Sequence, residues 1–181
     1  LQDGYLPIPS VHWKHEAFGL GVTALVEGTP RRSQLVARYR LTNTGRSKRN
    51  YALALAIRPL QVNPPTQFLS TVGGFSPIRE LSIREGRVEV DGQSVARASV
   101  QSAADVVTSF DAGDIVERLV QMQWRRFLDH TTAGAGSDSI ADTADDADGL
   151  ASGAVLYRAS LAAGESYEVD VFAAMTGTTD T

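Results

Sequence analysis

Leu35-Val36-Ala37-Arg38-Tyr39-Arg40-Leu41-Thr42-Asn43-Thr44-Gly45 is the stretch of sequence that decides the fold. Apolar or aromatic residues occupy its odd positions as far as Leu41, whereas arginine and threonine lie between them from Arg38 onward. This period of two predicts a β-strand with one buried face, closed by a turn at Asn43-Thr44-Gly45. Residues 18–26 alternate in a similar way and end at Gly28-Thr29-Pro30. The two stretches therefore predict consecutive strands of one sheet.

Residues 51–57 differ, because neither face of the predicted strand is polar. Tyr51, Leu53, Leu55 and Ile57 alternate with three alanines. A strand that is apolar on both faces is covered on both, and an alanine face lets a second layer approach closely. The pattern therefore predicts a central strand.

Short strands separated by turn signals make up much of the remaining chain. Residues 78–100 predict a small meander, in which Glu85-Gly86 and Asp91-Gly92 are two-residue turns. A further strand is expected over residues 106–110.

The last two predicted strands cover residues 154–159 and 166–174. They predict a final hairpin across Ala162-Ala163-Gly164-Glu165. In that hairpin Val155 and Tyr157 would face Val169 and Val171.

One helix and one acidic loop interrupt this pattern. Residues 114–129 carry apolar side chains at helical spacing, with Asp114 available as the N-cap. Residues 131–149 are rich in Ala, Gly, Ser, Thr and Asp, which predicts a flexible acidic loop. We therefore expect an all-β fold: a large antiparallel two-layer β-sandwich with one short helix, forming a single domain over residues 1–181.

The composition excludes several classes of function. The 181 residues contain no Cys, so disulfides and thiolate-based metal or redox sites are excluded. No apolar run approaches the roughly 18 residues of a membrane span. The formal net charge of −4 disfavours nucleic-acid binding. Residues 28–79 are basic and the last third is acidic, so we expect such segments to become neighbouring strands that neutralise each other.

The sequence predicts no catalytic residue, no metal ligand and no cofactor. A Gly-x-Ser-x-Gly elbow is absent, and Gly19-Leu20-Gly21 lies inside a strand pattern rather than in a phosphate-binding loop. His12, His15 and His130 are the only imidazoles, and the first two fall on opposite faces of an extended segment. The acidic run over residues 142–149 has the composition but not the ligand spacing of a calcium loop. A solvated loop is favoured there, with a weak calcium contact as the alternative.

Two segments carry the candidate binding residues. The first is His12-Trp13-Lys14-His15-Glu16, where Trp13 could stack on a sugar ring or fill a core or interface. The second is the proline-fixed loop that follows residue 57. Its polar groups could bind a polyol, or could satisfy the loop and a partner domain. The candidates for carbohydrate or domain-interface contacts are Trp13, His15, Arg58, Gln61, Asn63 and Gln67.

The chain resembles a known family in three stretches. The first is residues 35–45, and the third is residues 159–166, just before the closing strand. The second is residues 53–59 together with the loop that overlaps their end, Arg58-Pro59-Leu60-Gln61-Val62-Asn63-Pro64-Pro65. Together they are similar to the galactose-mutarotase-like β-sandwich. That sandwich precedes the helical (α/α) barrel of bacterial glycoside hydrolases and phosphorylases of the glucoamylase or glycogen-debranching kind. The resemblance covers residues 11–174.

The resemblance implies a non-catalytic role, because the general acid and base of such enzymes lie in the barrel. This chain, which begins at Leu1 rather than Met, would be a sandwich domain cut from a larger polypeptide. It would pack on the neighbouring barrel and shape its cleft for an oligo- or polysaccharide. It would also expose an apolar patch where that partner was removed. The alternatives are a stand-alone carbohydrate-binding module and an adhesion or assembly domain. A periplasmic or secreted location is slightly favoured over a cytoplasmic one.

Overall fold

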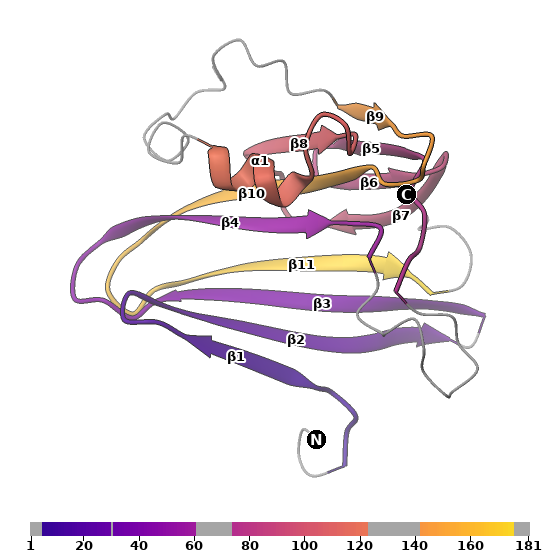
Figure 1. The fold of residues 1–181 in the computed structure, drawn as a ribbon. Coiled ribbons are helices and arrows are strands. Elements are labelled where there is room, and N and C mark those ends of the chain that lie inside the picture. The colour runs from indigo at the N-terminus through magenta and orange to yellow at the C-terminus, as the bar shows by residue number, and fades with distance from the viewer. Residues whose placement is uncertain (1–4, 30, 61–73, 123–141, 176–181) are drawn as a thin grey trace. The chain divides into compact units, whose positions relative to one another are not determined.

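The computed structural model describes residues 5–29, 31–60, 74–122 and 142–175 (Figure 1). Over these residues the strands belong to two antiparallel sheets, one of eight strands and one of three, accompanied by one short helix. The all-β, sandwich-like architecture expected from the sequence is thereby confirmed. In chain order the elements are β1 (Ser10–Lys14), β2 (Phe18–Thr29), β3 (Arg32–Asn43), β4 (Arg49–Ile57), β5 (Glu80–Arg84), β6 (Arg87–Val90), β7 (Gln93–Ala98), β8 (Ala104–Thr108), α1 (Ile115–Gln121), β9 (Thr143–Asp145), β10 (Ser152–Leu161) and β11 (Ser166–Ala174).

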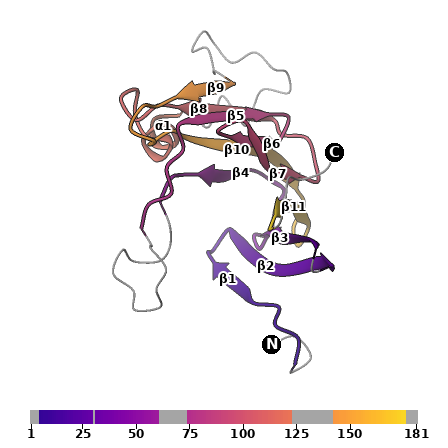
Figure 2. The same ribbon diagram turned by 90° about the vertical axis from the view of Figure 1, so that its right-hand side faces the viewer.

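The chain packs as two compact units. The first comprises Leu1–Leu53, Ser94–Gln101 and Tyr157–Thr181, and the second comprises Ala54–Gln93 and Ser102–Leu156. In the first unit β1, β2, β3 and β11 lie side by side in that order, with β7 beyond β11 (Figures 1 and 2). All of these neighbours run antiparallel. The hairpin of β2 and β3 is thus confirmed.

The inner face of the first unit is built from the apolar positions of this alternation. Leu41 on β3 and Val169 on β11 are buried there, and Tyr157 and Leu161 of β10 are buried in the same unit. The rings of Tyr157 and Tyr167 lie 6.4 Å apart, centroid to centroid. Because side chains alternate along a strand, the polar positions of β3 and β11 face the other way.

Asn43 is the buried polar centre of the first unit. Its side-chain nitrogen donates to the carbonyls of Ser47 (2.8 Å) and Leu161 (2.9 Å), and its side-chain oxygen accepts from Gly45 N (2.9 Å) and the Tyr51 hydroxyl (2.8 Å). The side chain is fully buried, with all four of its hydrogen-bonding positions used. The predicted turn at Asn43-Thr44-Gly45 is therefore also a link between layers.

The predicted final hairpin is wrong. β10 and β11 lie in different sheets, and β11 pairs with β3 instead. The chain crosses from one layer to the other at residues 162–165, where Gly164 N donates to Asn43 O and Asn43 N donates to Glu165 O, both at 2.9 Å. A turn sequence alone does not distinguish a connection between two sheets from a hairpin within one sheet, because both reverse the direction of the chain.

The second unit has its own core around the start of β10. Ile115, Ala154 and Leu156 are fully buried there, with Ala54, Val106 and Leu119 among the residues packed against them. The hairpin of β5 and β6 is confirmed, and its Glu85-Gly86 turn has φ of 52° and 77°, as a type I′ turn requires. β9 pairs with the other edge of β5.

The expected central position of residues 51–57 is wrong. β4 is an edge of the three-stranded sheet, and β10 lies between β4 and β8. Only Leu53 is buried in β4, whereas most of β10 is buried. β10 takes the centre because its small residues allow close packing: a Cβ on Gly153 would lie 2.8 Å from Ile83 Cδ1 and 2.9 Å from Leu81 Cδ2.

The helix ends earlier than expected, and three residues of the expected acidic loop form a strand. The predicted N-cap is confirmed, since the Asp114 carboxylate accepts from Val116 N at 2.9 Å. The helix ends at Gln121, because Met122 is extended, and residues 123–129 lie outside the described residues. Within the expected loop 131–149, residues 143–145 form β9, and residues 131–141 lie outside the described part.

Candidate binding groove

The outward face of β1, β2, β3 and β11 carries polar side chains in three rows across the strands. Strand register places Ser10, Thr23, Arg38 and Asp170 in one row, and His12, Gly21, Arg40 and Glu168 in the next. The third row is Lys14, Gly19, Thr42 and Ser166. We call these three rows the polar face.

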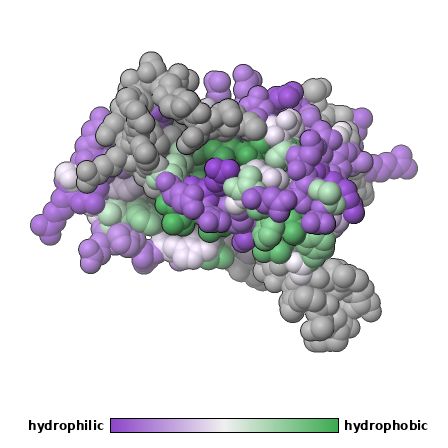
Figure 3. Space-filling view, turned by 45° about the horizontal axis from the view of Figure 1, so that its top comes forward, coloured by the Kyte–Doolittle hydropathy of each residue, from purple (hydrophilic) through white to green (hydrophobic). Residues whose placement is uncertain are grey.

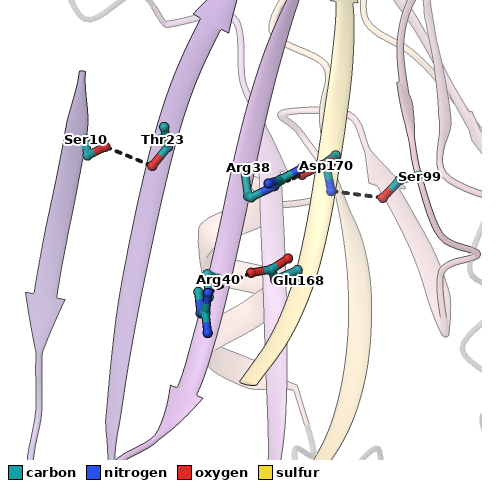
Figure 4. Close-up of polar contacts among 7 residues, drawn as sticks. All are labelled: Ser10, Thr23, Arg38, Arg40, Ser99, Glu168 and Asp170. Carbon is teal, nitrogen blue, oxygen red and sulfur yellow. Dashed lines mark hydrogen bonds and ion pairs between the residues drawn. The ribbon is translucent and has the colours of Figure 1, made fainter. Parts of the chain in front are cut away.

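Ion pairs between β3 and β11 hold the polar face in place (Figure 4). Arg38 donates from Nε and Nη2 to the two carboxylate oxygens of Asp170, each at 2.8 Å. Arg40 Nη1 lies 3.2 Å from Glu168 Oε1. The basic and acidic segments of the chain thus neutralise each other on neighbouring strands here, as expected from the charge distribution.

The Arg38–Asp170 pair shifts the pKa of both groups. The hydrogen bonds and charge of Arg38 hold the Asp170 pKa below its usual range, and Asp170 raises the pKa of Arg38. Both groups are therefore ionised at neutral pH. Asp170 N donates to Ser99 Oγ at 2.9 Å, and Ser10 Oγ lies 2.9 Å from Thr23 Oγ1 (Figure 4).

A groove of about 760 Å³ lies along the polar face and the turn that follows β1. Glycine makes part of its floor. A Cβ on Gly19 would meet nothing closer than 3.8 Å, whereas a Cβ on Gly21 would lie 3.1 Å from His12 Nδ1. The imidazole of His12 therefore lies over Gly21, whereas the floor at Gly19 has room for a methyl group, bounded by Thr44 Cγ2 and the Trp13 carbonyl oxygen. The lining residues are His12, Trp13, Lys14, His15, Glu16, Gly19, Leu20, Gly21, Thr23, Arg38, Arg40, Thr42, Thr44 and Glu168.

Side-chain contacts of His15 and Thr44 fix the end of the groove that lies at the β1–β2 turn. The ring of His15 stacks on Phe18 with centroids 5.0 Å apart, and His15 Nδ1 accepts from Ala17 N at 3.2 Å. The Thr44 hydroxyl donates to the carbonyls of His15 and Glu16, at 3.3 Å each. This end of the groove is thus held from both β1 and the turn after β3.

The structure brings together two of the six residues predicted for binding. Trp13 and His15 are both among the residues that line the groove. The Trp13 carbonyl oxygen lies 3.9 Å from the position of a Gly19 Cβ, whereas strand alternation turns its side chain, which is 52% exposed, to the opposite face of β1. Arg58 belongs to the second unit, where its Nε lies 3.1 Å from Asp114 Oδ2. Gln61, Asn63 and Gln67 lie outside the described residues.

Sequence reasoning missed the charged residues that shape the groove, Lys14, Arg38, Arg40, Glu168 and Asp170. Arg38 and Arg40 were visible as the polar positions of a strand, and Glu168 and Asp170 occupy the same positions in the last strand. The signal was their matching period of two. Without the pairing of β3 with β11, nothing indicated that these positions share one face.

The acidic run after residue 141 forms a turn held by the main chain. The Asp146 carboxylate accepts from Phe110 N (2.8 Å), Leu150 N (3.0 Å) and Asp148 N (3.1 Å). These bonds, the one from Phe110 above all, lower the Asp146 pKa. The described ranges contain no group of three or more His, Cys, Asp or Glu placed to hold a metal ion. Their helix is too short and too polar to cross a membrane.

Comparison with known proteins adds no family to these observations. No protein-family model matches the chain, and no curated protein matches its sequence significantly.

Proposed function

We propose that the chain is a non-catalytic β-sandwich domain of a multidomain carbohydrate-active enzyme, and that the groove is its sugar-contacting surface. The observation that carries this proposal is the groove itself, where hydrogen-bond donors and acceptors alternate on an open sheet face. A polyhydroxylated ligand needs both kinds of partner on every side. Because Arg38 and Arg40 are already paired, their donors are pre-positioned and binding orders few side chains.

The state of the acidic side chains supports the non-catalytic part. A glycosidase needs a carboxylic acid that keeps its proton until the leaving group departs. Asp170 is held in the opposite state, since Arg38 lowers its pKa. The Glu168 carboxylate is engaged by Arg40, whose Nη1 lies 3.2 Å from Glu168 Oε1.

Binding and turnover by the 181-residue chain test this proposal. Neutral oligosaccharides are titrated by calorimetry and by tryptophan fluorescence, and each is also assayed for hydrolysis. We expect saturable binding without turnover. The double substitution Arg40→Ala and Glu168→Ala preserves net charge and should weaken binding roughly tenfold, as loss of one or two charge-assisted hydrogen bonds would.

The matched control is the exposed pair of Arg84 and Asp142, whose Nε and Oδ2 lie 4.0 Å apart in the second unit. Removing both of these side chains also preserves net charge and should leave the affinity unchanged. Equal affinity of both double variants would overturn the groove as the site. Turnover of any sugar by the chain would overturn the non-catalytic role.

A second role, docking of a neighbouring domain, is favoured by exposed apolar residues on the other face of the first unit. Val11, Trp13 and Val26 are each more than half exposed, and strand alternation places them on the side away from His12 and Lys14. Figure 3 shows further hydrophobic areas among hydrophilic side chains on one face of the molecule. Exposed apolar surface of this kind is typical of interfaces.

The test of this role compares the chain with a longer product of the same reading frame. Acrylamide quenching of tryptophan should fall in the longer protein, and Trp13→Phe should remove most of that difference. Unchanged quenching would argue against docking on this face.

A further inference from the structure

Among the described residues, Lys14 is the cationic side chain of the groove that has no ion-pair partner. Three Lys or Arg residues line it, and the other two, Arg38 and Arg40, pair with Asp170 and Glu168. Within the described part of the chain, no carboxylate lies within ion-pair distance of Lys14. Glu16, in the turn after β1, also lines the groove but forms no ion pair with it. A ligand with one negative charge would complete this site.

The floor beside Lys14 is bare main chain. Lys14 and Thr42 flank Gly19 in the third row of the polar face, which places their Cα atoms about 10 Å apart across two strand spacings. A Cβ on Gly19 would fit without a clash, in ordinary contact with Thr44 Cγ2 at 3.8 Å and the Trp13 carbonyl oxygen at 3.9 Å. The Thr42 hydroxyl, 2.7 Å from Ser166 Oγ, lies in the same row on the other side of Gly19 from Lys14.

We infer that the groove selects oligosaccharides that contain a uronic acid, with the sugar carboxylate above Gly19 and paired with the Lys14 ammonium. This inference rests on the proposed sugar-binding function and names its ligand class. A carboxylate matches one uncompensated lysine, because each carries a single charge. A phosphate monoester carries about −1.5 to −2 at neutral pH and would leave charge unpaired.

Paired ligands isolate the contribution of the carboxylate. An oligosaccharide with a single galacturonate residue, the uronate probe, and its methyl ester have the same hydroxyl groups and differ by one charge. We expect the acid to bind roughly five- to tenfold more tightly at low salt, the range for one charge-assisted contact at an exposed site. Lys14→Gln should remove this preference and Lys14→Arg should keep most of it. Near 1 M salt the preference should shrink, because ions screen exposed charges.

The lysine content of the chain provides an internal control. Lys14 and Lys48 are its only lysines, and Lys48 is exposed between β3 and β4. Lys48→Gln makes the same charge change and should leave the preference intact. Acetylation followed by mass spectrometry should show Lys14, but not Lys48, protected by the uronate probe. Acetate alone should protect neither, because it lacks the hydroxyl contacts.

The outcomes separate this inference from the function on which it rests. Equal binding of acid and ester, with no effect of Lys14→Gln, would overturn the uronate inference and leave a neutral-sugar groove standing. Protection of Lys48 as strong as that of Lys14 would also overturn it. Failure of every acidic and neutral oligosaccharide to bind would overturn both.

Discussion

Arg38 and Asp170 face each other across β3 and β11, with both guanidinium–carboxylate hydrogen bonds at 2.8 Å. These residues are 132 positions apart in the chain. Their ion pair joins β3, which carries basic side chains, to β11, which carries acidic ones. The pair belongs to the face that holds the groove. It therefore links the register of the sheet to the geometry of the proposed site.

Asp170→Asn should lower stability at neutral pH but not in acid. The folded-state pKa of Asp170 is depressed, so its contribution is present above the unfolded pKa of about 3.9 and is lost as pH falls through the lower folded value. Because the Arg38 side chain is 54% exposed, we expect a loss of only about 0.5–1 kcal/mol at pH 7. Urea unfolding at neutral and acidic pH measures it. An equal deficit in acid, where the carboxyl group is protonated in both the folded and the unfolded state, would contradict this origin.

Asn43→Ala should be strongly destabilising. The substitution removes four hydrogen bonds and leaves the buried Leu161 carbonyl without the amide of Asn43, whereas the Tyr51 hydroxyl keeps its bond to Ala17 O at 2.6 Å. An orphaned buried group costs about 1–3 kcal/mol and each further lost hydrogen bond about 1 kcal/mol, so a loss of about 3 kcal/mol in the free energy of unfolding is expected. Asn50→Ala is the control, since Asn50 is exposed and its Oδ1 accepts from Ser160 Oγ at 2.7 Å near the surface. Similar losses for the two variants would contradict the role of Asn43.

Gly153→Ala should overpack the second unit. The added methyl group would lie 2.8 Å from both Ile83 Cδ1 and the Val106 carbonyl oxygen. Main chain cannot move aside as a flexible side chain can, so we expect a loss of about 1–3 kcal/mol in denaturant unfolding. Gly19→Ala meets nothing within 3.8 Å and should stay within about 0.5 kcal/mol of the parent chain. A neutral Gly153→Ala would show that β10 is packed more loosely.

Asp146→Asn should weaken the turn after β9. The amide has one accepting oxygen where the carboxylate has two, and three main-chain N–H groups donate to Asp146. The lowered pKa of Asp146 means that the loss, about 1 kcal/mol as for a helix cap, should be largest at neutral pH and vanish in acid. Asp145→Asn, one residue earlier on β9, is the matched control and should change little. Thermal unfolding across pH measures both.

Local patterns were sufficient for most individual strands. The alternation of residues 35–42, the Glu85-Gly86 turn and the Asp114 cap all depend on neighbours within a few residues, and the structure has each of them. The predictions that proved wrong concern which strands lie next to each other in the sheets. Residues 51–57 looked central because alanine is apolar, yet exposure depends on which strand lies beside it, and small residues in β10 fit the centre better.

By itself, the sequence determined that this chain is all-β, Cys-free and charge-segregated, and that β2 and β3 form a hairpin. Those properties depend on composition and on contacts between residues close in the chain. Only the tertiary structure decided that β11 pairs with β3 rather than β10, and that pairing sets Glu168 and Asp170 opposite Arg40 and Arg38. Strand pairing over long sequence distances is selected by the fit of whole layers. The groove depends on that fit, and no local pattern encodes it.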